Sequence, residues 1–108
     1  MLPYEITVSE VKTRLDRGDS LVLLDVREPW ETATSSIAGA LCIPMGELPA
    51  RANNELDPDS EIVVFCHLGM RSLNVTAWLR EQGYDHVQSM AGGIDRWTRE
   101  IDPKVPLY

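Results

Sequence analysis

The chain has 108 residues, of which 44% are hydrophobic and 25% are charged, and its formal net charge is −7. We expect residues 1–108 to form a single domain, because this size and composition are typical of one globular core. The acidic balance disfavours nucleic acid and anionic membranes as partners, since both bind basic surfaces. No apolar run approaches the roughly 20 residues that span a bilayer, and the N-terminus lacks the features of a signal peptide. A cytoplasmic protein is therefore expected.

A helix with well-marked ends is the first expected element. Thr7 can act as its N-cap, with Glu10 placed to complete a capping box, and Gly18 ends it. The later elements are expected as strands over 21–24, 40–43, 62–65 and 87–90, and as helices over 29–33, 47–53, 72–82 and 94–100. Strands that alternate with helices indicate an α/β fold with a mainly parallel sheet and helices on both faces.

The two cysteines differ in their surroundings. Two thiols are too few for a disulfide framework, and no Cys/His spacing resembles a zinc site, so the sequence predicts no metal and no cofactor. A free cysteine is either a small buried apolar residue or a reactive one. Cys42 lies within an apolar strand and is expected in the core, whereas Cys66 lies where a strand gives way to a loop.

Residues 65–72 combine the end of the clearest strand, a short loop with one glycine, and the start of a helix. In open parallel sheets, ligands bind beyond the carboxyl ends of the strands. A loop that curls before a helix N-terminus points several backbone N–H groups at one place, and the helix dipole adds to this positive field. We therefore expect Cys66 to be a nucleophilic thiolate and the catalytic residue.

The other loop residues have chemical roles in this pattern. Arg71 supplies a permanent charge that can hold an anionic substrate, and Gly69 suits a loop whose backbone must approach the ligand closely. His67 either hydrogen-bonds a substrate oxygen or points to solvent. The residues expected to bind the substrate are His67, Leu68, Gly69, Met70, Arg71 and Ser72.

Some other notable residues are expected to have structural roles. Asp25 and Arg27 lie at a strand end, where we expect them to orient loops and to pair with nearby charges. The three tryptophans, Trp30, Trp78 and Trp97, are expected to be core or partly covered aromatic residues.

Four motifs in the sequence resemble those of the rhodanese family, and the similarity covers nearly the whole chain. The motifs are Asp25-Val26-Arg27-Glu28, Ile37-Ala38-Gly39-Ala40 with Ile43-Pro44, Cys66 to Arg71, and Gly92-Gly93-Ile94 with Trp97. The resemblance implies five parallel strands wrapped by helices and a persulfide on Cys66. Two differences from the family are visible: Ser35-Ser36 replaces the usual Gly-His, and Leu68 and Met70 give the loop an apolar rim that disfavours thiosulfate, a dianion.

The resemblance implies a sulfurtransferase. A donor such as thiosulfate or a persulfide leaves sulfane sulfur on Cys66, and a thiophilic acceptor such as cyanide or a thiol removes it. An alternative is a sulfur-relay or rhodanese-like interaction module that delivers sulfur to a protein partner. Phosphatase or arsenate reductase chemistry is disfavoured, because those related enzymes have one more residue in the loop than the six from Cys66 to Arg71.

Overall fold

The computed structural model describes residues 2–108, and its centre is one all-parallel sheet with the strand order β1-β5-β4-β2-β3. The strands are β1 (Glu5–Ile6), β2 (Val22–Asp25), β3 (Leu41–Cys42), β4 (Ile62–Phe65) and β5 (Val87–Met90). The expected parallel α/β fold is confirmed. Because β4 is the central strand, the loop that follows it opens at the middle of the carboxyl edge.

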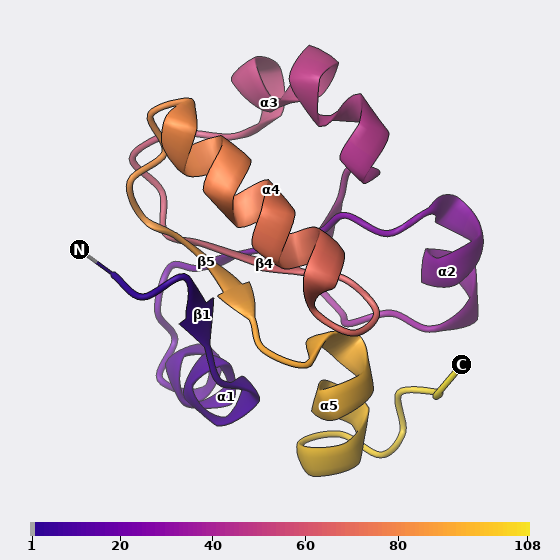
Figure 1. Ribbon diagram of the computed structural model, residues 1–108. Coiled ribbons are helices and arrows are strands. Elements are labelled where there is room, and N and C mark those ends of the chain that lie inside the picture. The colour runs from indigo at the N-terminus through magenta and orange to yellow at the C-terminus, as the bar shows by residue number, and fades with distance from the viewer. Residues whose placement is uncertain (1) are drawn as a thin grey trace.

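Helices cover both faces of the sheet. They are α1 (Val8–Asp16), α2 (Pro29–Thr34), α3 (Leu48–Glu55), α4 (Met70–Glu81) and α5 (Gly93–Glu100), and a 3-10 turn, η1 (Met45–Glu47), precedes α3. Figure 1 shows α3 and α4 above the sheet and α1 and α5 below it, while α2 lies to one side, close to the C-terminal segment.

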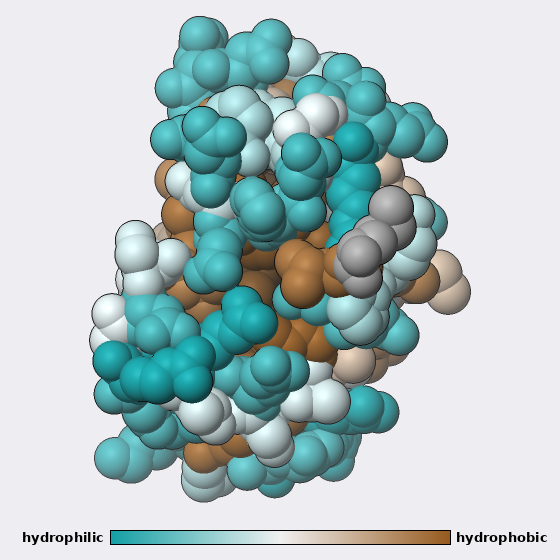
Figure 2. Space-filling model, turned by 90° about the vertical axis from the view of Figure 1, so that its left-hand side faces the viewer, coloured by the Kyte–Doolittle hydropathy of each residue, from teal (hydrophilic) through white to brown (hydrophobic). Residues whose placement is uncertain are grey.

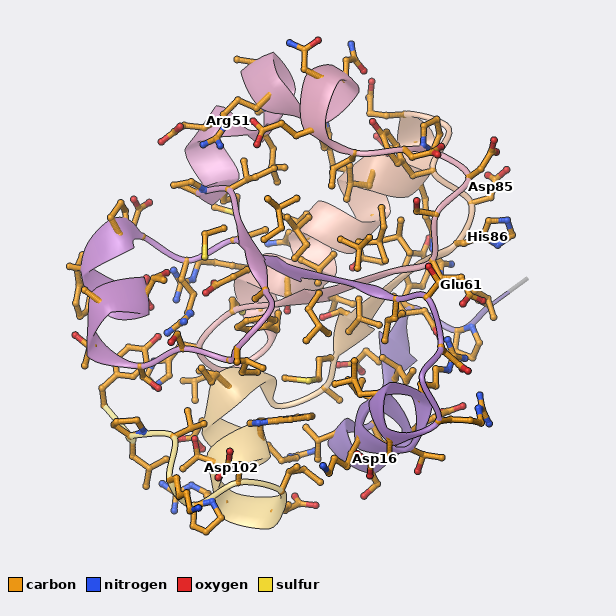
Figure 3. All side chains as sticks on the ribbon, turned by 180° about the vertical axis from the view of Figure 1, so that it is seen from behind. Asp16, Arg51, Glu61, Asp85, His86 and Asp102 are labelled. Atoms are coloured by element: carbon orange, nitrogen blue, oxygen red, sulfur yellow. The ribbon has the colours of Figure 1, made fainter. Side chains whose placement is uncertain are left out.

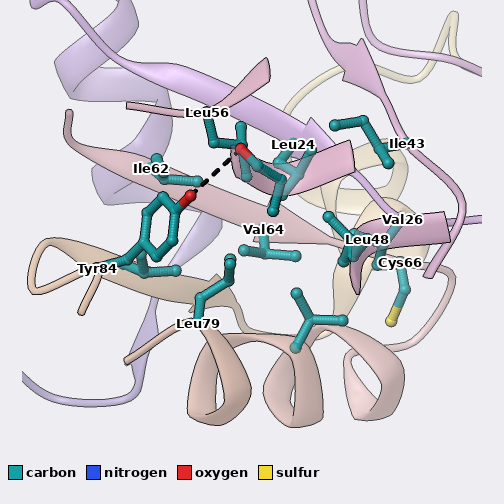
Figure 4. Close-up of a cluster of buried hydrophobic side chains, with 13 residues drawn as sticks. Leu24, Val26, Ile43, Leu48, Leu56, Ile62, Val64, Cys66, Leu79 and Tyr84 are labelled. Atoms are coloured by element: carbon teal, nitrogen blue, oxygen red, sulfur yellow. Dashed lines mark hydrogen bonds between the residues drawn. The ribbon is translucent and has the colours of Figure 1, made fainter. Parts of the chain in front are cut away.

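The apolar residues of β4 alternate between two cores. Ile62 and Val64 pack with α3 and α4, whereas Val63 and Phe65 pack with α1 and α5. Both faces are therefore buried, which explains the continuous apolar run in the sequence. Figure 4 shows the first core, which includes Cys66 at the end of β4.

The ends of α1 follow the expected chemistry in part: Thr7 caps the helix, but within residues 2–108 the Glu10 side chain makes no return bond to complete a capping box and lies near Arg14 instead. The Thr7 hydroxyl accepts a hydrogen bond from the N–H of Glu10 at 3.1 Å, and Gly18 after the helix has a φ of 81°. The sequence did not predict β1. This strand has only two residues, of which only Ile6 is buried, and its place in the sheet depends on pairing with the distant β5.

Two expectations about burial are wrong. Cys42 is exposed rather than in the core, because β3 is a two-residue edge strand and the neighbouring Ile43 is buried instead. Trp30 is 64% exposed, because the side of α2 that faces the protein carries Glu31. Trp97 is buried and Trp78 is partly buried, as expected.

The outer surface is largely hydrophilic. Figure 3 shows Asp16, Glu61, Asp85, His86 and Asp102 at the periphery of the protein. The face that lies away from α2 and the C-terminus is mostly hydrophilic above and below, with hydrophobic residues showing between (Figure 2). Within residues 2–108, no helix has both the length and the hydrophobicity needed to cross a bilayer.

Candidate active site

Cys66 lies directly after β4, at the N-terminal end of α4. Its Sγ accepts hydrogen bonds from the N–H of Gly69 at 3.2 Å and from the N–H of Ser72 at 3.3 Å. The side chain is 1% exposed, so these donors act where little water competes with them. The loop therefore curls around the sulfur, and backbone N–H groups and the positive end of α4 stabilise negative charge on it.

Helix α5 holds the loop in this conformation from the other side. The N–H of Ile94 donates to the carbonyl of Cys66 at 2.9 Å, and the N–H of Asp95 donates to the carbonyl of His67 at 3.1 Å. A Cβ on Gly93 would lie 2.6 Å from the Cys66 carbonyl oxygen. The glycine pair Gly92-Gly93 thus lets the start of α5 approach the loop backbone closely enough to bind it.

Two serine hydroxyls extend the polar surroundings of Cys66. The Oγ of Ser72 lies 3.4 Å from Sγ, 3.2 Å from the Gly69 carbonyl oxygen and 2.7 Å from the Oγ of Ser89. Both serines are fully buried. Since a hydroxyl has one proton, Ser72 can donate it either to the carbonyl or to a thiolate, and it can change partner when the charge on Cys66 changes.

Arg71 does not extend freely over the loop. Its Nη1 donates to Oε1 of Glu31 at 2.7 Å, and its Nη2 donates to Oε2 at 2.8 Å. Only 4% of the Glu31 side chain is exposed, compared with 32% of the Arg71 side chain. The sequence did not predict this ion pair between α2 and α4.

Glu31 is strongly stabilised in its ionised form. The hydrogen bonds from Arg71 lower the pKa of Glu31 from 4.5 to about 2, and those from Tyr108 and the Glu28 backbone add to this effect, although burial opposes it. The bond from Glu28 is part of a capping box at the start of α2. Glu31 therefore carries a negative charge at neutral pH.

Asp25 and Arg27 form a second, deeper ion pair. Nε and Nη2 of Arg27 donate to the two carboxylate oxygens of Asp25 at 2.9 and 2.7 Å, and both side chains are almost fully buried. Arg27 also donates to the carbonyl of Ser35 at 2.6 Å. The pair joins the end of β2 to the end of α2. Ser35, one of the residues that replace the family's usual Gly-His, has a buried hydroxyl without a hydrogen-bond partner in residues 2–108.

Tyr108 returns to the site from the end of the described chain. Its hydroxyl donates to Oε2 of Glu31 at 2.7 Å and accepts from Nη1 of Arg27 at 3.0 Å. Its ring stacks on His67, with 4.0 Å between the ring centroids and 13° between the planes. Burial raises the pKa of Tyr108 to about 12, and the hydrogen bond to Glu31 adds to this, while the bond from Arg27 acts in the opposite direction.

The structure thus separates the residues expected to bind substrate into three groups. Gly69 and Ser72 face the sulfur, His67 and Arg71 contact Tyr108 and Glu31 respectively, and Leu68 and Met70 are exposed. Glu31 and Tyr108 were missed. The spacing of Glu28 and Glu31 indicates a helix cap but not the pair with Arg71, and no local pattern connects Tyr108 to residues 77 positions away.

Cys42 is not part of this arrangement, because β2 lies between β3 and β4 in the sheet. No group of three or more His, Cys, Asp or Glu side chains that could hold a metal ion is found within residues 2–108. What the loop offers is a single buried sulfur, backbone donors around it and an arginine beside it. This combination suits a nucleophilic cysteine that receives and releases a small group.

Comparisons with known proteins agree with the fold. A family model described as "Rhodanese-like domain" matches residues 7–100. The chain is 40% identical to a putative sulfurtransferase, YtwF, of Bacillus subtilis, covering 93% of this chain and 95% of the relative. It is 37% identical to a sulfurtransferase of Allochromatium vinosum, covering 94% of each chain.

A solved structure has the same architecture. The crystal structure of a rhodanese-related protein from Thermoplasma volcanium matches with a TM-score of 0.84 and 30% identity, covering 98% of this chain and all of that chain. Sequence and structure therefore agree over nearly the full length. The chain belongs to the rhodanese-like family, and its relatives named as sulfurtransferases support a role in rhodanese-type sulfur transfer.

Proposed function

We propose that the chain transfers sulfane sulfur through a persulfide on Cys66. The observation that carries this proposal is the position of Sγ, which accepts two backbone N–H bonds at the start of α4. These donors stabilise a thiolate before the reaction and the negative terminal sulfur after it, because both species lie inside the same loop.

Two balanced steps make up the proposed cycle. The Cys66 thiolate attacks the outer sulfur of thiosulfate or of a persulfide, the donor S–S bond breaks, and its electron pair leaves with sulfite or with the carrier thiolate. In the second step cyanide or a thiolate attacks the terminal sulfur of the Cys66 persulfide and releases the Cys66 thiolate. Neither step needs a metal, an oxidant or a reductant, since sulfur is passed on in one oxidation state.

A protein acceptor is the second candidate, and the apolar rim of the site favours it. Leu68 and Met70 are 63% and 71% exposed beside the reactive sulfur. A groove of about 230 Å³ between α3 and α4 is lined mainly by apolar side chains, among them Met45 and Trp78. Apolar surface around a reactive group is suited to protein contact.

Whether the acceptor is a small molecule or a protein, we propose that residues 1–108 act as one domain. The cytoplasmic location stays a prediction.

Turnover assays with paired cysteine variants test the proposal. The protein would be supplied with thiosulfate, or with a small-molecule persulfide, and cyanide, and thiocyanate would be measured. Cys66→Ser should lose the activity, because an alcohol forms no persulfide, whereas Cys42→Ser should retain most of it, because Cys42 lies on the far side of β2. Circular dichroism would check that both variants fold. Activity that survives Cys66→Ser but not Cys42→Ser would show that the site is wrongly assigned.

A further inference from the structure

The guanidinium group of Arg71 is already bound to an anion of the protein itself. Its two terminal nitrogens donate to the two oxygens of the Glu31 carboxylate, at 2.7 and 2.8 Å. Arginine binds carboxylates and other oxyanions through this same pair of parallel hydrogen bonds. Glu31 therefore occupies the Nη1–Nη2 edge of Arg71, one of the two edges through which a guanidinium can bind an oxyanion of a substrate.

Glu31 is fixed in that position by contacts on both oxygens. Oε1 also accepts from the N–H of Glu28 at 3.0 Å, and Oε2 also accepts from the hydroxyl of Tyr108 at 2.7 Å. With the side chain almost completely buried, an exchange of partners requires these bonds to break together. The low pKa of Glu31, about 2, agrees with this geometry, so its charge is permanent at neutral pH.

This fixed charge changes what the site can attract. The hydrogen bonds that Arg71 donates to Glu31, with a smaller contribution from the nearby Cys66 thiolate, raise the pKa of Arg71, so both partners of the pair stay charged and neutralise each other. A dianion such as thiosulfate then meets no net positive side chain and must compete with Glu31 for the guanidinium. A persulfide on an uncharged carrier has one negative charge and needs no oxyanion contact, so it loses much less.

We propose that Glu31 is a specificity-determining residue of the Cys66 site, which blocks the anion-binding edge of Arg71 and thereby favours persulfide donors on uncharged carriers over thiosulfate. Tyr108 is the positioning residue, since its hydroxyl bridges Glu31 and Arg27 while its ring stacks on His67. The inference rests on the proposed sulfur transfer at Cys66. In the favoured step the Cys66 thiolate takes the outer sulfur of the persulfide, and the electron pair of the broken S–S bond leaves with the carrier thiolate.

The direct test is to remove the charge of Glu31 and keep its shape. Glu31→Gln should lower the KM for thiosulfate roughly tenfold, the size typical of one regained charge-assisted contact. The KM for the persulfide of 2-mercaptoethanol, whose carrier is uncharged, should change by less than about twofold. A purely structural role for Glu31 predicts the opposite, because a loosened Arg71 would raise the KM for both donors.

Binding without turnover gives an independent measurement. Thiosulfate would be titrated by calorimetry into the Cys66→Ser variant and into Cys66→Ser combined with Glu31→Gln. The combined variant should bind thiosulfate roughly tenfold more tightly, as expected for one charge-assisted contact. Glu55→Gln is the matched control. It removes the same charge from the far end of α3, where Glu55 pairs with Arg51, and should leave thiosulfate binding unchanged.

Tyr108→Phe tests the positioning role and guards against a Glu31 variant that does not fold. It removes only the hydroxyl, so thiosulfate binding should tighten in the same direction but by less. Unchanged or weaker thiosulfate binding in both variants would overturn the proposal, as would equal tightening by Glu55→Gln. Failure of the underlying function would be separate: no form of the protein would gain sulfur on Cys66, while the titrations would still decide the role of Glu31.

Discussion

Charged side chains around Cys66 occur in pairs. Arg71 is neutralised by Glu31, and Arg27 is neutralised by Asp25. The positive field at the sulfur therefore comes mainly from oriented backbone groups, namely the N–H groups of Gly69 and Ser72 and the start of α4. Because the ion pairs carry no net charge, only these backbone groups are left to stabilise negative charge on a bound sulfur compound. They suit a persulfide, which has one negative charge, better than a dianion.

Acid stability should depend measurably on Glu31. Its pKa is lowered from 4.5 in the unfolded chain to about 2 in the folded protein, so its contribution is present above pH 4.5 and is lost as the pH falls through 2. The contribution is on the order of 3 kcal/mol at most, because solvent reaches Arg71 and screens part of the attraction.

Urea unfolding of the native protein and of Glu31→Gln between pH 5 and pH 2 measures this contribution. The native protein should lose more free energy of unfolding over this range than the variant, in which residue 31 does not titrate. All other acidic residues are common to both proteins and cancel in the difference. Parallel curves would show that the Glu31–Arg71 pair adds nothing to the stability of the fold.

Prediction from sequence was uneven at the level of single residues. The position of Cys66 could be inferred because a strand, a loop and a helix follow one another locally in the sequence. The partner of Arg71 could not, because Glu31 lies 40 positions away and its spacing from Glu28 is already explained by helix capping. Trp30 was misplaced for a related reason: the buried side of α2 carries a charged residue and its exposed side an aromatic one.

Two helix N-termini meet at the loop of the candidate site and act on opposite sides of its backbone. The start of α4 directs N–H groups of the loop at Cys66, while the start of α5 binds the carbonyls of Cys66 and His67. The C=O and N–H bonds of a trans peptide group point in opposite directions. When α5 binds the carbonyl of a loop peptide group, the N–H of that group therefore points away from α5. The closing Gly-Gly motif thus shapes a site formed by residues about 25 positions earlier, a relation that spacing alone does not reveal.

Gly93→Ala should disrupt this contact between elements. Gly93 has a φ of 63°, and a Cβ there would overlap the carbonyl oxygen of Cys66. We expect a loss of roughly 1–3 kcal/mol in the free energy of unfolding, together with a marked loss of sulfur transfer, because the loop must shift. Urea titration and the thiocyanate assay would measure the two effects.

Gly46→Ala is the matched control for this substitution. Gly46 has no positive φ, and a Cβ there meets no atom within 4 Å. Its stability should change by no more than about 0.5 kcal/mol, as is usual for surface substitutions. Equal stability and activity in the two variants would show that α5 does not need to approach the loop backbone closely.

The regular elements of the whole molecule could largely be predicted, because β2 and β4 carry short apolar runs and most of the helices have a recognisable start or end, although the bounds of α3 and α4 differ by one or two residues from those expected. The alternation of strands and helices was sufficient to indicate a parallel sheet, and the structure shows in addition that β4 is buried on both faces. The features that could not be predicted depend on contacts between residues far apart in the sequence. Strand β1 pairs with β5, and the C-terminal segment brings Tyr108 into contact with α2. These contacts have no local signature.

The acidic net charge and the exposed apolar rim both affect which sulfur donors can approach the proposed site. A net charge of −7 repels small dianions at long range, whereas Leu68 and Met70 offer contact to an apolar carrier or a protein segment at short range. Both features act in the same direction as Glu31. At the scale of the whole molecule, both features therefore support the proposed preference for a persulfide donor over a free inorganic anion.

Intact-mass spectrometry after exposure to a sulfane-sulfur donor tests sulfur transfer by Cys66 most directly. The protein would be treated with the persulfide of 2-mercaptoethanol or with excess thiosulfate, freed of donor, and weighed before and after addition of cyanide. We expect one added sulfur atom, mapped to Cys66 by peptide analysis, absent from Cys66→Ser, and removed by cyanide with release of thiocyanate. A protein that gains no sulfur from either donor, or that carries it on Cys42, would contradict sulfur transfer at Cys66.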